Sequence, residues 1–249
     1  QFHIGPNTFA LVQPKAPPPP IIQPAIKPVK VDPSSQATDY ILLHRITSGG
    51  QADVWKAESK KTKDLVVIKF LTNLPYDSND AQYLKAKFQQ QIILGQTIRH
   101  PNCVKIYGGN SQVELPYIVE EFLSGGTLRH LMNHQNPPIE DIVKIIGEVC
   151  DGLNYLHKRN IIHRDLSPEN IMFDGHKVTR VIDFGLARVA GTQTKTQVGM
   201  VVGKPKYMAP EQAKGDLALI GAHTDLYAVG IIAYEMLNWD TPFEGEGWG

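Results

Sequence analysis

The chain lacks several features that would indicate particular classes of protein. It has two cysteines among 249 residues, Cys103 and Cys150. A secreted disulfide scaffold would need more, so two distant thiols favour a reducing, cytoplasmic setting in which both are buried. Its nine histidines do not follow the paired Cys/His spacing of a zinc site.

Excess charge and long apolar runs are also missing. Lys and Arg together number 25, as do Asp and Glu, so the net charge is zero. No basic excess indicates a nucleic-acid partner or an attraction to a membrane surface. The longest apolar runs, such as residues 228–233, are far shorter than the roughly 20 residues that span a bilayer. We therefore expect neither nucleic-acid binding nor a membrane segment in this chain.

Proline is concentrated in residues 1–38, which include four consecutive prolines at 17–20. Proline fixes φ and removes a backbone donor, so we expect neither a helix nor a central strand there. The segment is predicted to be a polyproline-II or disordered tether. It could serve as a plain linker or as the ligand of a proline-binding domain.

The pattern changes at Tyr40, where a strand-rich region begins. Turn residues separate expected strands at 40–47, 53–58, 65–71, 104–107 and 117–121. Asp80 is expected to cap a helix that runs to Ile98. After Gly126 we expect a helix ending at His157, a hairpin over 171–182 and an apolar helix over 224–237. This order predicts an α+β fold, with a small β-rich lobe followed by a larger helical lobe.

Three motifs follow one another in the second half of the chain. Residues 163–170 read HRDLSPEN, residues 183–185 read DFG, and residues 209–211 read APE. On these motifs, residues 39–249 resemble the eukaryotic-type serine/threonine protein kinases, including bacterial members. The resemblance implies a bilobal kinase-like fold, with an N-lobe and hinge over 39–122 and a C-lobe over 123–249. It also implies that the last C-lobe helices, one of which would carry an arginine partner for Glu211, are absent from this sequence.

The resemblance implies ATP and Mg²⁺ as cofactors and a protein as substrate. Phosphoryl transfer depends mainly on positioning and charge neutralisation. Asp165 would accept the proton of the substrate hydroxyl, and Asn170 and Asp183 would offer oxygen ligands to Mg²⁺. Lys69 ends the run VVIK (66–69) and would bind the phosphates. The catalytic loop lacks the Ala/Arg pattern of tyrosine-specific relatives, which favours Ser/Thr acceptors.

A nucleotide pocket is expected between the two lobes. The glycine-rich loop keeps only the middle glycine of the usual three, Gly49, although Gly50 lies beside it. Residues 117–123 resemble the hinge, whose backbone would contact the adenine edge. The residues expected to bind nucleotide are Ile46, Gly49, Gly50, Val54, Val67, Lys69, Glu121, Leu123 and Met172.

Two pairs of residues have exchanged their usual places. Gln91 occupies the helix position that normally holds the glutamate partner of the lysine, whereas Glu120 replaces an uncharged residue at the gatekeeper position. We hypothesise that Glu120 pairs with Lys69, which requires the two groups to lie within about 6 Å; the alternative is that Glu120 points to solvent. Similarly, Ser167 stands where the catalytic loop normally has a lysine, and Lys204 where a threonine is usual. Lys204 is therefore predicted to supply the positive charge for the γ-phosphate.

Two further expectations concern how the active state forms. Gly95 replaces a bulky apolar residue, so a gap and a mobile helix are expected there. Arg164, Arg188 and Lys87 are predicted to form a basic pocket for a phosphorylated threonine, Thr194 or Thr196. The alternative is a solvated loop with unmodified threonines.

The sequence supports more than one class of function. The leading interpretation is an active kinase, because Lys69, Asp165, Asn170 and Asp183 are all present. The second is a pseudokinase scaffold that binds nucleotide or a protein partner, suggested by Gln91, Gly95 and the altered glycine-rich loop. A small-molecule phosphotransferase is a third, but the APE motif and the long segment before it argue against that class.

Overall fold

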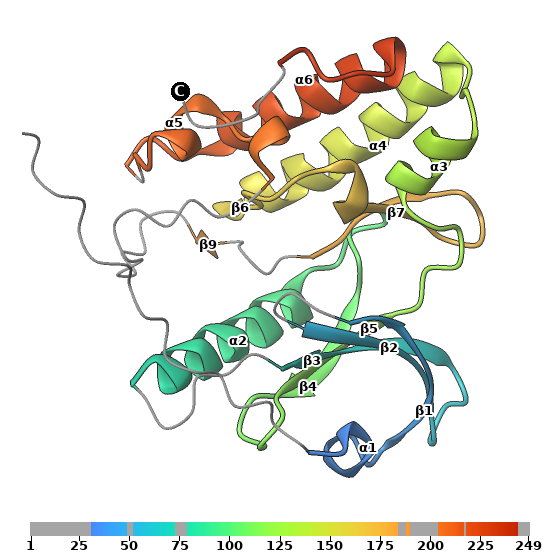
Figure 1. The fold of residues 1–249 in the computed structure, drawn as a ribbon, viewed down its shortest axis with the longest axis vertical. Coiled ribbons are helices and arrows are strands. Elements are labelled where there is room, and N and C mark those ends of the chain that lie inside the picture. Colours follow the sequence, from blue (N-terminus) through green and yellow to red (C-terminus); the bar gives the residue numbers. More distant parts are fainter. Residues whose placement is uncertain are drawn as a thin grey trace, which may run out of the picture.

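The computed structural model describes residues 31–48, 52–72, 79–183, 188–189, 204–216 and 218–243. These residues form two lobes, with a sheet and a long helix below and a mainly helical lobe above (Figure 1). The lower lobe has a five-stranded antiparallel sheet of order β1-β2-β3-β5-β4. Its strands are β1 (Tyr40–Thr47), β2 (Ala52–Ser59), β3 (Leu65–Leu71), β4 (Ile106–Asn110) and β5 (Tyr117–Glu121). The two-lobed α+β prediction is confirmed.

The short helix α1 (Pro33–Gln36) contacts β1, and the residue that follows it, Ala37, is buried. Alternate β3 residues Val66, Ile68 and Phe70 pack in a buried cluster that also contains Ala37. The expectation of no helix before residue 39 is therefore wrong for residues 33–36. Pro33 stands at the start of the helix, where its missing N–H costs nothing, and the Asp32 side chain caps the Ser34 N–H at 3.0 Å. Residues 31–38 thus pack on the N-lobe and are not part of a free tether.

Strand β4 begins two residues later than predicted. The backbone before it pairs with the other lobe instead, because the Val104 N–H donates to the Val181 carbonyl and the Val181 N–H to the Asn102 carbonyl, both at 2.9 Å. The strand continues through Gly108 and Gly109 to Asn110. A Cβ at Gly109 would lie 2.3 Å from the Tyr117 carbonyl oxygen, so the close approach of β5 requires glycine.

Helix α2 (Asn79–Thr97) packs against β4 and starts one residue before the predicted cap. The gap expected at Gly95 does not exist. A Cβ there would lie 2.1 Å from the Ile106 Cδ1 atom, so this side chain already fills the space. Glycine at this position lets the helix and the strand approach closely.

The second lobe is built on two long helices, α4 (Ile139–His157) and α6 (Ala222–Asn238). The α4 residues Ile142, Ile145, Val149, Leu153 and Leu156 recur at helical spacing and are all buried. The remaining elements are α3 (Leu128–His134), β6 (Ile161–Ile162), η1 (Pro168–Asn170), β7 (Ile171–Phe173), β8 (Thr179–Val181), β9 (Arg188–Val189), η3 (Pro205–Tyr207) and α5 (Pro210–Ala213). The strands β6 and β7, between which residues 163–170 lie in the sequence, are on the side of this lobe that faces the N-lobe sheet (Figure 1).

Two expectations from composition concern membrane spans and the cysteines. Among the described residues, no helix combines the length and apolar character needed to cross a membrane. Both cysteines are free thiols; Cys103 is buried as expected, whereas Cys150 is only partly buried. 

Candidate active site

Strand register brings Lys69 and Glu120 to the same face of the sheet. Lys69 pairs with Ile118 and Val67 with Glu120 across β3 and β5. Residues two apart on a strand share a face, so Glu120 lies diagonally across from Lys69. The Lys69 Nζ and Glu120 Oε2 atoms are 3.1 Å apart, within the 6 Å that the exchange hypothesis requires. Gln91, at the usual glutamate position, lies partly buried on α2.

The Lys69–Glu120 pair is almost removed from water. The exposed fraction of the side chain is 17% for Lys69 and 8% for Glu120. Burial opposes the charge of Lys69, but Glu120, together with Asp183 at 4.0 Å, outweighs it and raises the pKa of this ammonium. Burial also raises the pKa of Glu120, which the Lys69 charge offsets only in part. Each charge of the pair stabilises the other, because neutralising one group would leave the other buried without its nearest partner.

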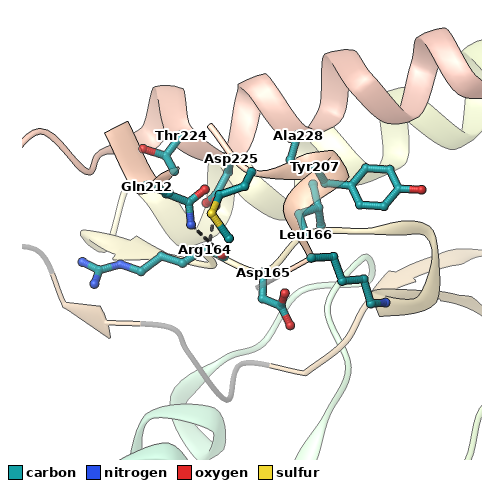
Figure 2. Close-up of a pocket in the computed structure, with 10 residues that line it drawn as sticks. Arg164, Asp165, Leu166, Tyr207, Gln212, Thr224, Asp225 and Ala228 are labelled. Atoms are coloured by element: carbon teal, nitrogen blue, oxygen red, sulfur yellow. Dashed lines mark hydrogen bonds between the residues drawn. The ribbon is translucent and has the colours of Figure 1, made fainter. Parts of the chain in front are cut away.

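The catalytic loop is held by Asp225 on α6. Its two carboxylate oxygens accept the backbone N–H groups of His163 at 2.9 Å and Arg164 at 2.8 Å. Arg164 has a φ of 69°, which is unfavourable for a side chain other than glycine. The Gln212 Nε2 donates to the Arg164 carbonyl at 2.8 Å and helps to fix this conformation (Figure 2). Asp225 therefore supports the loop from the α6 side.

Asp165 projects from the other side of this loop, away from Asp225 (Figure 2). The Asn170 Nδ2 donates to the Asp165 carbonyl at 2.6 Å and to its Oδ2 at 3.1 Å. Burial, assisted by the nearby Asp183 carboxylate, raises the pKa of Asp165, although His163 and Lys204 partly offset this. A carboxylate oriented by an amide and raised in basicity is suited to accept a hydroxyl proton.

The predicted Ser167–Lys204 exchange corresponds to a direct contact. The Lys204 Nζ donates to the Ser167 Oγ at 3.0 Å. It also donates to the Glu169 Oε2 at 2.6 Å. Lys204 precedes η3 and lines the same pocket as Asp165. The catalytic loop has Ser167 at the position where a lysine is usual. The structure places the Lys204 ammonium beside this serine, so a positive charge is present there.

Sequence reasoning missed a buried polar network next to this contact. The Arg129 guanidinium binds Glu169 at 3.0 Å and Glu235 at 2.9 Å. It also donates to the Tyr207 hydroxyl, which in turn donates to Glu235 at 2.6 Å. An acidic residue at a buried position of an apolar helix, such as Glu235, usually has a cationic or hydrogen-bonding partner. Glu235 was therefore the sequence feature that could have indicated this network.

The residues expected to bind nucleotide are placed as follows. Val54 pairs with Lys69 across β2 and β3, so Val54, Val67 and Lys69 share one face of the sheet. Ile46 is half exposed on β1, whereas Leu123 is buried after β5. Met172 lies on β7, and the Glu121 side chain contacts the Lys105 N–H at 2.7 Å, away from Lys69. Gly49 and Gly50 lie outside the described residues.

The predicted regulatory pocket can be placed only in part. Lys87 lies on α2 and Arg164 on the catalytic loop, with its side chain pointing away from Asp165 (Figure 2). Thr194 and Thr196 lie outside the described residues, and Arg188 is described only as part of β9. The pocket and its phosphothreonine stay predictions.

The oxygen donors of the site suit a magnesium ion shared with phosphates. Asn170 uses its Nδ2 for Asp165, so its amide oxygen is left for a cation. Asp183 adds a carboxylate that is 47% exposed, in a backbone with a φ of 63°. No group of three His, Cys, Asp or Glu side chains suited to a metal occurs among the described residues. Two protein oxygens plus phosphate and water is the coordination that Mg²⁺ favours.

Comparison with known proteins agrees with this geometry. Residues 40–247 match the family described as Protein kinase domain, so the chain belongs to the protein kinase family. It is 35% identical over 205 residues to the serine/threonine-protein kinase PknB of Mycobacterium leprae, covering 80% of this chain and 32% of that protein. It is 33% identical over 208 residues to PrkC of Bacillus subtilis, also a serine/threonine-protein kinase, covering 83% and 30%.

A probable serine/threonine-protein kinase PknB of Lactococcus lactis is similar to the same extent. It is 34% identical over 213 residues, covering 84% of this chain and 33% of the relative. The chain therefore spans about a third of the length of the curated relatives it matches.

Proposed function

We propose that this protein transfers the γ-phosphate of ATP to serine or threonine hydroxyls of protein substrates. The proposal is carried by two groups of residues. Asp165, Asn170 and Lys204 meet at the catalytic loop, and Lys69 pairs with Glu120 on strands β3 and β5. The kinase family membership and the serine/threonine-specific relatives support the same reaction.

Each group has a distinct role in the proposed reaction. Asp165 accepts the hydroxyl proton and directs the oxygen towards the phosphate. Lys69, held by Glu120, binds phosphate oxygens, and Lys204 offsets charge on the transferred group. Asn170 and Asp183 hold Mg²⁺, which supplies charge neutralisation when bound.

The partner and location follow from the same proposal. A protein kinase needs ATP, and together with the free thiols Cys103 and Cys150 this favours a cytoplasmic position for the domain. The proline-rich residues before 31 are proposed as a tether that could engage a proline-binding domain, and simple linkage is the alternative.

A transfer assay with matched variants tests the function. The full-length protein is incubated with Mg-ATP and a generic protein substrate, and phosphoserine and phosphothreonine are measured. Asp165→Asn should abolish transfer, and Lys204→Met should lower kcat strongly while nucleotide binding remains. Undiminished transfer by Asp165→Asn would reject the proposed base, and a wild-type protein that binds ATP without transfer would favour the scaffold interpretation.

A further inference from the structure

The Lys204 ammonium is fixed by a carboxylate from the catalytic loop itself. Its Nζ lies 2.6 Å from the Glu169 Oε2 and 3.0 Å from the Ser167 Oγ. The Lys204 side chain is 43% exposed, so packing alone does not restrict its four-carbon stem. Ordering such a stem costs rotamer entropy. The contacts with Glu169 and Ser167 are therefore what hold the amine beside Asp165.

Glu169 is in turn fixed from its other side. Its Oε1 accepts the Arg129 Nε at 3.0 Å, and Arg129 is anchored to the buried Glu235 at 2.9 Å. Although burial opposes it, hydrogen bonds from Lys204 and Arg129 lower the pKa of Glu169 to about 2. One oxygen of the Glu169 carboxylate therefore contacts each cation.

We propose that Glu169 is a positioning residue that holds the Lys204 ammonium in place for phosphoryl transfer, and that Arg129 sets the orientation of Glu169. This rests on the proposed function, in which Lys204 meets the charge of the transferred phosphate. Both oxygens of Glu169 bind protein cations, one of which is Lys204, so the contacts present in the structure favour the positioning role.

Because Glu169 pairs with both Arg129 and Lys204, its charge does not fully neutralise the Lys204 ammonium. The Glu169 charge is divided between Lys204 and Arg129. A phosphate group carries more negative charge than this shared carboxylate and competes for the Lys204 donors. Lys204 has three donors, so it can contact phosphate while Glu169 and Ser167 still hold it.

A double-mutant cycle in kcat separates positioning from general structural support. Wild-type protein, Glu169→Gln, Lys204→Met and the double variant are compared at saturating Mg-ATP. Glu169→Gln should lower kcat about tenfold, with the KM for ATP changed less than twofold. In the Lys204→Met background the same change should cost less than twofold, because the group that Glu169 positions is gone.

Two further variants sharpen the cycle. Glu169→Asp keeps the carboxylate on a shorter stem and should retain more kcat than Glu169→Gln. Glu58→Gln is the control, because Glu58 pairs with Lys63 at 3.6 Å with a similar exposure but on the far hairpin of the N-lobe; it should leave kcat unchanged. An equal loss from Glu169→Gln in both backgrounds, an unchanged kcat, or a fully active Lys204→Met would overturn the proposal.

A measurement independent of activity keeps the two proposals distinguishable. Acylation of lysine amines by a small reagent is followed by mass spectrometry on the full chain, with the exposed neighbour Lys206 as internal reference. Lys204 should react several-fold faster in Glu169→Gln than in wild type, because its ion pair is lost. Equal rates would overturn the positioning role. Absence of phosphate transfer, or transfer that survives Asp165→Asn, would instead reject the proposed function while the labelling result still stands.

Discussion

Replacing Glu120 by glutamine tests the ion pair that holds Lys69, the residue proposed to bind the nucleotide. At an effective dielectric of about 20, the attraction across 3.1 Å between Lys69 and Glu120 is about 5 kcal/mol. The attraction of Asp183 across 4.0 Å is about 4 kcal/mol before solvent screening, and Asp183 is much more exposed. Glu120→Gln therefore leaves Lys69 with one weak, solvated partner.

The expected loss of folding free energy follows from burial. Removing one member of a buried pair costs about 3–5 kcal/mol, and the remaining Asp183 places this site near the lower end, at about 3 kcal/mol. Urea unfolding of Glu120→Gln, Lys69→Met and the double variant should give a coupling energy of about 2 kcal/mol. Glu114→Gln, an exposed charge in the same lobe, is the control and should change stability by less than about 0.5 kcal/mol.

Two results would contradict this reasoning. A stability of Glu120→Gln within about 0.5 kcal/mol of wild type would show that the buried ammonium does not need this carboxylate. Strictly additive effects of the two single variants would show that Lys69 and Glu120 do not interact. We also expect a higher KM for ATP in Glu120→Gln, because Lys69, the proposed phosphate-binding residue, is no longer held in place by Glu120.

Three further predictions address the fold and the loop that carries Asp165. In α4, Gly152→Ala would place a Cβ 2.7 Å from the Asn102 carbonyl oxygen and should destabilise the protein by more than about 1 kcal/mol, whereas Gly147→Ala in the same helix meets no atom within 4 Å and should stabilise it by about 1 kcal/mol; thermal unfolding with the opposite order would refute the packing. Asp225→Asn turns one acceptor into a donor facing backbone N–H groups, so urea unfolding should show a loss of about 2 kcal/mol, with a lower kcat; an unchanged kcat would mean that the loop does not depend on this support. The lowered pKa of Glu169 means that its stabilisation is complete above the unfolded-state value near 4.5 and is lost as the pH falls towards about 2. The stability difference between wild type and Glu169→Gln, measured by denaturant unfolding, should therefore shrink as the pH falls from 5 to 3, and a difference that stays constant would contradict it.

Local pattern was sufficient for the regular elements of this domain. The α4 helix could be predicted because its apolar residues repeat at helical spacing, and β5 because Tyr117, Ile118 and Val119 are aromatic or β-branched residues that follow a turn. The strand period of two also made the Lys69–Glu120 pairing predictable once β3 and β5 are neighbours. The two elements depend on residues close together in the chain, and the Lys69–Glu120 contact depends only on the pairing of β3 with β5.

Predictions failed where a residue's environment comes from distant segments. Proline content alone argued against structure before residue 39, but burial of Ala37 against β3 orders the turn at Pro33. Gly95 suggested a gap, yet Ile106 from β4 fills it. In both cases packing across the tertiary structure outweighed local propensity.

The chemistry of the site divides in the same way. The sequence by itself determined the family, and it predicted the roles of Asp165, Asn170 and Asp183 and the exchange of charges at Lys69 and Lys204, because these are matters of residue type and spacing. Only the tertiary structure decided how those charges are held. Arg129 joins Glu169, 40 residues away, to Glu235, 106 residues away. An ion pair depends on separation in space, and no local pattern in the chain specifies which distant side chains meet.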